Sequence, residues 1–355
     1  MRSPVSHKLI GTLLSAVTAL TGLSPAEPAH EPGPGAAPAE GGGPAAAVSS
    51  AQAAAPSAPQ DEGRAAPAGL DAPGVVRQAA AVGEAEHREV LDYWTPQRMA
   101  EAAPLVPGLG ELAAGLLPGS GADPQAAAPG STGEPWSGGG RVARTTGKVF
   151  LTLDGRDFTC SAAVVSADNR DTVITAGHCL KDGSGPWAGK WVFVPGYADG
   201  QSPHGRYTAR QMFVAPQWAD GADDSYDFGM AVLNRSGGKH VQDRVGAQTI
   251  AFGAEPEDPT YAFGYPATGR FEGRRLHYCS GATTDDSGGT TANGMACAMT
   301  EGSSGGPWLN DFDEKSGKGT VVSVISFKYA DDTRTQYGPH LGPAARRIYE
   351  RAQSF

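Results

Sequence analysis

The sequence predicts an all-β fold of the sandwich or barrel kind. From residue 146 onward, short runs rich in β-branched and aromatic residues recur at short intervals. Turn-forming pairs such as Asp154-Gly155 and Ser316-Gly317 separate these runs. Residues 146–355 are numerous enough to build two six-stranded barrels.

The expected strands form two groups, with a gap that contains glycine between them. The first group comprises residues 148–153, 158–165, 171–176, 190–194, 207–214 and 227–233. The second group comprises residues 260–265, 275–280, 295–299 and 319–327. One helix closes the chain, because Pro343 suits a first helical turn and one face carries Leu341, Ala345, Ile348, Tyr349 and Ala352.

Residues 1–26 are predicted to be a secretory signal peptide. A short basic stretch ends at Lys8, and the apolar run Leu9–Leu23 that follows is too short for a membrane span. Small residues near Ala26 suit cleavage by a signal peptidase. We therefore expect a secreted protein that is free of the membrane once the signal has been removed.

Residues 27–140 are expected to be a pro-region and linker rich in Ala, Pro and Gly. Residues 27–81 have too few large apolar residues to offset the entropy of ordering, so we expect them to be disordered and dispensable for activity. A short helical segment is predicted near 84–104, where Thr95 can cap a helix that starts at Pro96. A short recognition helix in a linker would have the same pattern. The folded domain is expected to cover residues 141–355.

The charge distribution excludes a nucleic-acid binder. Residues 1–140 carry 6 Lys/Arg and 14 Asp/Glu, whereas the remaining residues carry 22 and 24. The acidic excess therefore lies in the N-terminal segment, and the folded part is nearly neutral without a basic stretch.

All four cysteines lie in the folded part, and no Cys-x-x-Cys pair is present. In an exported protein an even number of cysteines indicates disulfides. Four cysteines allow three pairings, which the sequence alone leaves open. Pairing of neighbours would join Cys160 to Cys179 and Cys279 to Cys297.

Two short motifs carry the chemistry. The buried strand that begins after Asp171 ends in Thr175-Ala-Gly-His-Cys179, which presents His178 at a tight turn. Far downstream, Glu301-Gly-Ser-Ser-Gly-Gly-Pro307 places Ser304 among glycines that permit a sharp turn and close approach of a substrate. Together the two motifs resemble the catalytic halves of chymotrypsin-like and trypsin-like serine peptidases, in particular the secreted bacterial ones.

This resemblance implies a fold, an activity and a set of partners. The fold would be two packed six-stranded antiparallel barrels, near residues 146–235 and 240–342, followed by the C-terminal helix. The activity would be that of a serine endopeptidase that cleaves polypeptides as a monomer, without cofactor, metal, nucleic acid or membrane. The stretch from Tyr93 to Leu105 also resembles the pro-segment of secreted bacterial members.

The resemblance also assigns the catalytic residues. Ser304 would be the nucleophile, His178 the base, and an acid between them in the sequence would orient the imidazole. Asp227 fits this third role, because it directly precedes an apolar run and resembles the family's acidic signature. Asp223 and Asp224 are the nearby rivals.

Further roles follow from the same resemblance. The backbone amides of Gly302 and Ser304 would form the oxyanion hole. The substrate-binding residues would be Ser326, Phe327 and Lys328.

One departure from the family pattern concerns activation. Ser303 stands where trypsin-type zymogens have the aspartate that pairs with a newly cut N-terminus. Activation by insertion of such an N-terminus is therefore not expected.

Two other functions share this sequence pattern. The same fold can serve as a catalytically silent binding protein, which usually lacks a member of the triad. An esterase-type acyl hydrolase would use the same triad with a larger apolar pocket.

Overall fold

The computed structural model describes residues 69–72, 74–106 and 130–355. The predicted signal peptide, residues 1–26, lies outside these ranges, as do residues 27–68 and 107–129 of the predicted pro-region. The described residues all belong to one compact unit. The N-terminal elements described below therefore belong to the same unit as the predicted peptidase domain.

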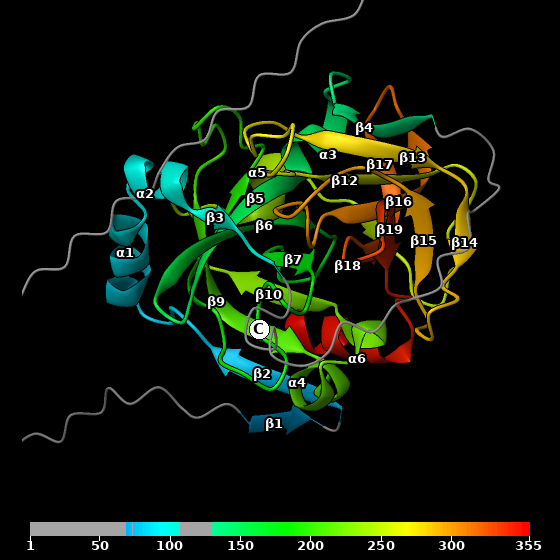
Figure 1. The fold of residues 1–355 in the computed structure, drawn as a ribbon. Helices are drawn as coiled ribbons and strands as arrows, with labels where there is room; N and C mark the ends of the chain where they lie inside the picture. The colour runs from blue at the N-terminus through cyan, green and yellow to red at the C-terminus, as the bar shows by residue number, and fades with distance from the viewer. Residues whose placement is uncertain (1–68, 73, 107–129) are drawn as a thin grey trace, which may run out of the picture. The chain divides into compact units, whose positions relative to one another are not determined.

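The first half of the domain is a closed six-stranded antiparallel barrel (Figure 1). The strands pair in the order β9-β10-β7-β6-β5-β8, and β8 pairs back with β9. Their bounds are β5 Thr146–Leu153, β6 Arg156–Val164, β7 Thr172–Thr175, β8 Gly189–Pro195, β9 Tyr207–Val214 and β10 Gly229–Leu233. All six were predicted from the sequence.

Local sequence explains why this barrel closes tightly. Every residue of β7 and β10 is buried, as expected of short apolar and β-branched runs inside a barrel. The turn between β5 and β6 is made by Asp154 (φ 49°) and Gly155 (φ 74°), the conformation that a two-residue hairpin requires. Short helical turns at α4 (Pro216–Gly221), η1 (Asp224–Tyr226) and α5 (Val241–Val245) connect the later elements.

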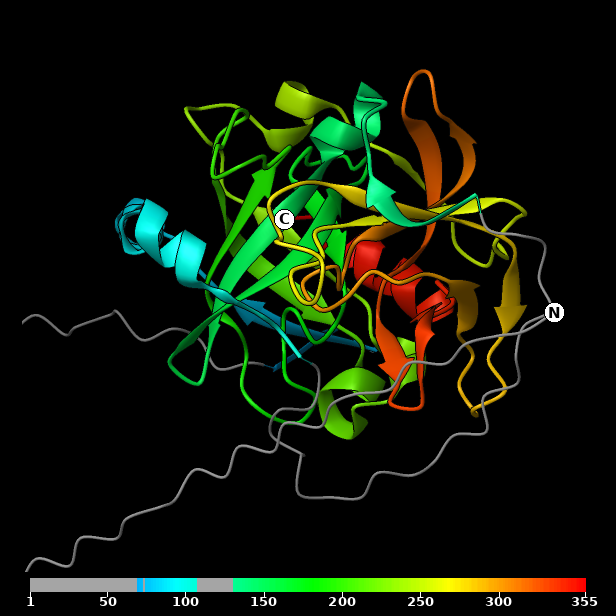
Figure 2. The same cartoon turned by 45° about the horizontal axis from the view of Figure 1, so that its top comes forward.

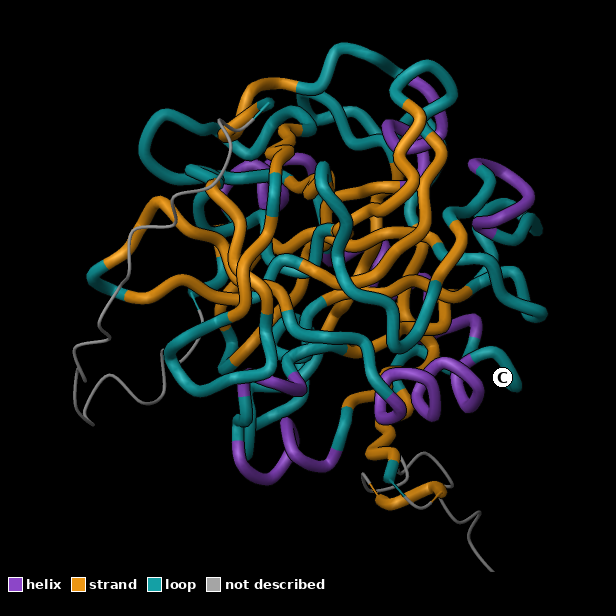
Figure 3. The backbone as a smooth tube through the Cα atoms, turned by 90° about the vertical axis from the view of Figure 1, so that its right-hand side faces the viewer, coloured by secondary structure: helices purple, strands orange, loops and turns teal. Residues whose placement is uncertain are grey.

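The second half consists of two sheets, whose strands lie among long loops in Figure 3. One sheet has the order β11-β17-β16-β12-β13-β4 and the other β14-β15-β19-β18. The bounds are β4 Ser131–Pro135, β11 Thr249–Ile250, β12 Thr260–Gly264, β13 His277–Gly281, β14 Thr283–Asp285, β15 Asn293–Ala296, β16 Pro307–Asp313, β17 Lys318–Val324, β18 Phe327–Tyr329 and β19 Asp332–Gly338. Closure of these sheets into a second barrel stays a prediction.

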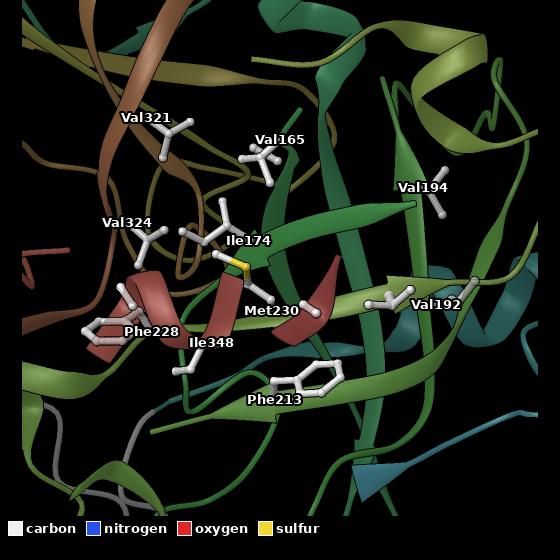
Figure 4. Packing of buried hydrophobic residues seen from close by; sticks show 14 of the residues in the cluster. Val165, Ile174, Val192, Val194, Phe213, Phe228, Met230, Val321, Val324 and Ile348 are labelled. Carbon is white, nitrogen blue, oxygen red and sulfur yellow. The ribbon is translucent and has the colours of Figure 1, made fainter. Parts of the chain in front are cut away.

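A buried cluster of apolar side chains joins the two halves (Figure 4). It includes Met230 from the first half, Val324 from the second, and Ile348 from helix α6 (Pro343–Ala352). The predicted C-terminal helix is confirmed, and its buried face includes Ala345, Ile348 and Ala352. Helix α6 therefore helps to fix the two halves against each other.

The N-terminal segment is more structured than predicted. The expected helix is present as α1 (Glu84–Tyr93) and α2 (Pro96–Glu101), and Thr95 caps α2 by accepting a hydrogen bond from the Arg98 amide. Both helices lie against the outside of the first barrel (Figure 2). The expectation of disorder up to residue 81 is wrong for β1 (Gly69–Ala72) and β2 (Val75–Ala79), because β2 adds to the barrel along β9.

Two further elements precede the predicted domain start at Arg141. Strand β3 (Ala103–Pro104) pairs with β6, and β4 pairs with β13. Helix α3 (Gly140–Thr145) then leads directly into β5. The ordered fold thus begins before residue 141, because backbone pairing can recruit segments that are poor in large apolar residues.

Candidate active site

His178 lies in a tight turn directly after β7. Its side chain is 3% exposed. Gly177 precedes it at a place without room for a side chain, since a Cβ there would lie 3.0 Å from Oδ1 of Asp227. The disulfide Cys160–Cys179 ties the turn to β6, which confirms this predicted pairing together with Cys279–Cys297.

Asp227 holds the His178 ring from one side. It lies between η1 and β10 and is 2% exposed. Its Oδ2 is 2.7 Å from Nδ1 of His178, and its Oδ1 accepts a 2.7 Å hydrogen bond from the backbone amide of the same residue. The Ser326 hydroxyl donates a third hydrogen bond, 2.5 Å, to Oδ2. Both the ring and the backbone of His178 are thereby fixed to one carboxylate.

The surroundings of Asp227 favour its ionised form. Burial alone would raise the pKa of this carboxyl group. The neighbouring imidazole of His178 and the hydrogen bonds from His178 and Ser326 outweigh burial, and they hold the pKa of Asp227 below its usual value. Asp227 therefore carries a negative charge at neutral pH.

The two rival acids have other surroundings. Asp223 accepts a 3.0 Å hydrogen bond from the Ser225 amide and so caps η1. Asp224 makes no hydrogen bond to His178 within the described residues. Partial burial of the Asp224 carboxyl and the nearby charge of Asp227 raise its pKa to about 6. Of these three acids, Asp227 is the one that hydrogen-bonds to the imidazole.

Ser304 lies in the turn that precedes β16 and is 5% exposed. Its carbonyl accepts a 2.7 Å hydrogen bond from the Ser161 amide, and it lies 3.6 Å from Sγ of Cys179. Position 305 requires glycine, because its φ is 83° and a Cβ there would lie only 2.1 Å from Oγ1 of Thr175. The serine turn and the histidine turn are therefore packed directly against each other.

The second ring nitrogen of His178 is available for chemistry. Nε2 is buried and makes no hydrogen bond to any other described residue. An ionised carboxylate only accepts hydrogen bonds, so the proton of the neutral ring must reside on Nδ1. Nε2 then has a free lone pair and can accept a proton.

The loop before Ser304 has the backbone that an anion site requires. Gly302 has a φ of 92°, and the Glu301 carbonyl is held by the Ala267 amide at 2.8 Å. Within the described part of the chain, neither the amide of Gly302 nor that of Ser304 donates a hydrogen bond. Both amides are free to receive an oxyanion.

Ser161 supports this loop, a role that the sequence analysis missed. Its hydroxyl donates to the Gly302 carbonyl at 2.9 Å and accepts from the Tyr265 amide at 3.0 Å. The only sequence signal was its place directly after Cys160.

A cavity of about 190 Å³ opens beside Ser304. The three predicted substrate-binding residues all line it, and so do Thr300, Glu301 and Gln336. Ser326 both lines this cavity and donates a hydrogen bond to Asp227. Gln336, which comes from β19, was not predicted as part of the site.

Lys328 shapes the wall of this cavity. Its ammonium donates hydrogen bonds to the carbonyls of Cys297 at 2.5 Å and Thr333 at 2.7 Å. Burial lowers the pKa of Lys328 to about 8. Phe327 stacks on Tyr337 with ring centroids 5.1 Å apart.

The residues of the site offer little to a metal ion. In the described ranges, the cluster that brings possible ligand atoms together comprises Cys160, His178 and Cys179. Both sulfurs are joined in a disulfide and cannot act as thiolate ligands. Within this cluster, the imidazole of His178 is the group that could still bind a metal ion.

The family model named Trypsin matches residues 137–341, which contain this entire site. The chain belongs to the trypsin family. It is a serine-type endopeptidase, and its substrates are polypeptides. Among the described residues of this trypsin-family enzyme, none of the helices is long and apolar enough to cross a membrane.

Two solved structures of proteases from microorganisms are similar to this trypsin-family enzyme. The protease Anisep from Arthrobacter nicotinovorans is 38% identical with a TM-score of 0.57, and the match covers 60% of this chain and 96% of that one. The thermostable serine protease AL20 from an extremophilic microorganism is 39% identical with a TM-score of 0.57, covering 60% and 99%.

A curated relative matches over a shorter stretch. The extracellular metalloprotease of Bacillus subtilis (strain 168) is 34% identical over 73 residues, which is 21% of this chain. This chain therefore spans 23% of the length of that relative.

Proposed function

We propose that His178, Asp227 and Ser304 form the catalytic triad of a secreted serine endopeptidase. The observation that carries this proposal is the pair of 2.7 Å hydrogen bonds by which Asp227 fixes the ring and backbone of His178. With Nδ1 bound to the carboxylate, Nε2 remains free to accept a proton.

The first half of the reaction forms an acyl-enzyme. Nε2 of His178 takes the proton of the Ser304 hydroxyl while Oγ bonds to the carbonyl carbon of the substrate. The carbonyl electrons move to oxygen, where the amides of Gly302 and Ser304 stabilise the charge. Each such donor contributes about 3 kcal/mol in the transition state. The C–N bond then breaks, and the imidazolium gives its proton to the leaving amine.

The second half uses water in place of the hydroxyl. Nε2 removes a proton from a water molecule, which attacks the ester carbon. The C–Oγ bond breaks and Ser304 regains a proton from His178. Asp227 stays ionised throughout, because its pKa is lowered by the ring and by the hydrogen bonds from His178 and Ser326.

The proposal includes the maturation and location of the enzyme. Residues 1–26 would direct export and be removed, and the pro-region would precede the catalytic domain in the secreted chain. Two disulfides suit an extracellular protein. We expect the enzyme to act as a monomer, with Ser326, Phe327 and Lys328 contacting the substrate.

Exhaustive labelling with a fluorophosphonate, followed by peptide mapping, tests the nucleophile. We expect one label per chain, on Ser304, and no label in Ser304→Ala. The matched control is Ser303→Ala. The Ser303 hydroxyl is engaged in a 2.6 Å hydrogen bond to the Thr300 carbonyl, so we do not expect it to react with the probe. Ser304 should still be labelled in this variant. A label on another residue, or peptide hydrolysis by Ser304→Ala, would contradict the proposal.

A further inference from the structure

A half-buried lysine lies in the wall of the cavity beside Ser304. Lys328 belongs to β18 and lines this cavity together with its neighbour Phe327. Its ammonium donates hydrogen bonds to the carbonyls of Cys297 at 2.5 Å and Thr333 at 2.7 Å. The two carbonyls hold the charged end of the side chain in one position.

The ammonium of Lys328 has more binding capacity than these two contacts use. An ammonium has three N–H donors, and the two carbonyls take two of them. A carbonyl carries no net charge, so neither contact neutralises the positive charge. Burial of a cation without a charged partner is costly, and it lowers the pKa of Lys328 to about 8. Lys328 therefore has one unused donor and a charge that lacks a contact partner.

Two carboxylates act on Lys328 from farther away. Glu301 and Asp332 both favour its charged form, but burial outweighs them. The Glu301 carboxylate accepts a 2.6 Å hydrogen bond from the Thr268 hydroxyl, and the Asp332 carboxylate accepts one of 2.6 Å from the Thr335 hydroxyl. Among the described residues, no carboxylate forms a hydrogen bond or ion pair with the Lys328 ammonium.

The other polar side chains that line the cavity already use their donors. The hydroxyls of Thr300 and Ser303 donate to backbone carbonyls at 3.2 and 2.6 Å, and the hydroxyl of Ser326 donates to a carboxylate. The side-chain amide of Gln336 donates to two carbonyls at 2.8 and 3.4 Å. Apart from the nucleophile, Lys328 is the described lining residue whose position leaves a donor for a ligand.

The proposed reaction decides which part of a substrate meets this donor. Ser304 attacks the carbonyl carbon of one substrate residue, so the side chain of that residue lies closest to the cavity beside Ser304. The cavity, about 190 Å³, has room for one side chain. In such cavities a few placed polar groups set the specificity.

We propose that Lys328 selects substrates with an acidic side chain on the residue whose carbonyl Ser304 attacks, by binding its carboxylate. The proposal rests on the function proposed above. A carboxylate supplies both the acceptor for the unused N–H and the missing negative charge. A carboxamide of the same shape supplies the acceptor alone, and a lysine or arginine side chain would bring a second positive charge.

Two peptides that differ only in Glu or Gln at this residue test the proposal. We expect kcat/KM at pH 7 to be at least fivefold higher for the Glu peptide. Lys328→Met keeps the length of the side chain and removes its charge, so the Glu/Gln ratio should fall below two. The matched control is Lys315→Met, which removes an exposed lysine outside the cavity and should leave the ratio unchanged.

The pH dependence of this ratio gives a second measurement that needs no variant. Lys328 loses its proton as the pH rises through about 8, whereas the glutamate of the peptide stays ionised. We expect the Glu/Gln ratio to fall at least threefold between pH 6.5 and 9.5. Titration of His178 affects both peptides alike and cancels in the ratio.

The outcomes separate this proposal from the catalytic assignment. A Glu/Gln ratio below five in an enzyme that is fully labelled on Ser304 would overturn the role of Lys328 and leave the triad in place. So would a ratio that is the same at pH 6.5 and 9.5, or one that survives in Lys328→Met. If neither peptide is cleaved and Ser304 takes no label, the proposed function itself is wrong.

Discussion

Asp223, Asp224 and Asp227 are close in the sequence, but their carboxylates have different tasks. The sequence favoured Asp227 because it directly precedes an apolar strand, and the hydrogen bonds to His178 support that choice. The contribution of Ser326 could not be predicted, since it reaches Asp227 from 99 residues away in the sequence. Ser161 and Gln336 were missed for the same reason: their contacts depend on how distant segments pack.

Replacing these acids one at a time tests the assignment. Asp227→Asn should lower kcat by roughly 10⁴-fold, because the carboxamide can donate to Nδ1 and leave Nε2 protonated. Asp224→Asn is the matched control, and its kcat should stay close to that of the unaltered enzyme. Steady-state kinetics on one peptide substrate check both. Loss of activity in Asp224→Asn alone would mean that the wrong acid has been assigned.

The raised pKa of Asp224 makes a separate prediction about stability. Its pKa in the folded state, about 6, exceeds its ordinary value, so keeping this group charged above pH 6 costs stability. That cost disappears as the pH falls from about 6 toward 4. Because Asp224 is only partly buried and part of the residue is open to solvent, screening reduces the effect to about 1 kcal/mol, or roughly 2–4 °C in Tm.

Thermal melts of Asp224→Asn at two pH values check this. The gain in stability of the variant over the unaltered chain should be clearly larger at pH 7.5 than at pH 4.5. Asp223→Asn serves as the control for removing one surface charge. A gain that is the same at both pH values would contradict the raised pKa.

At the scale of elements, the first barrel was the most predictable part. Its strands are short apolar runs with clear turn signals, so all six were found from the sequence. In the second half β16 and β19 were missed because polar residues interrupt their apolar runs, although Asn310 of β16 and Gln336 of β19 are buried in the fold. Strands β3 and β4 were missed because backbone pairing, rather than large apolar side chains, holds them in place, and β2 was missed because it adds one buried valine, Val75, to its pairing with β9.

Removing one disulfide at a time tests how much each bridge contributes to stability and activity, without replacing a residue of the triad. Cys160→Ala with Cys179→Ala should lower stability by about 3 kcal/mol, from the unfolded-state entropy of its loop. The pair Cys279 and Cys297 is a matched control, with separations of 19 and 18 residues. Its removal should cost similar stability.

The two pairs should differ in activity. Only the first bridge adjoins His178 and contacts Ser304, so only its removal should lower kcat markedly. Denaturant unfolding and kinetics at low temperature measure both effects. Equal loss of kcat in the two variants would contradict a specific role of the Cys160–Cys179 bridge in holding the histidine turn.

At the scale of the whole molecule, the N-terminal segment changes the expected architecture. Composition predicted that residues 27–81 are disordered and could be deleted without loss of activity. However, β2 extends the barrel along β9, and Val75 is 1% exposed. We therefore expect deletion of residues 27–81 to lower Tm, relative to a chain that lacks only residues 27–68. Calorimetry on the Ser304→Ala background checks this, and equal Tm values would show that β2 contributes no stability.

The central claim is that the histidine turn after β7 and the serine turn before β16 act as one catalytic unit. A double-mutant cycle on Ser304→Ala and His178→Ala tests it most directly, with kcat for peptide hydrolysis as the readout. Each single variant should lose roughly 10⁶-fold, and the double variant should be within about tenfold of either one, because removing either member disables the unit. If the losses multiply instead, so that the double variant is a further hundredfold or more below both single variants, His178 and Ser304 contribute independently and the triad does not operate as described.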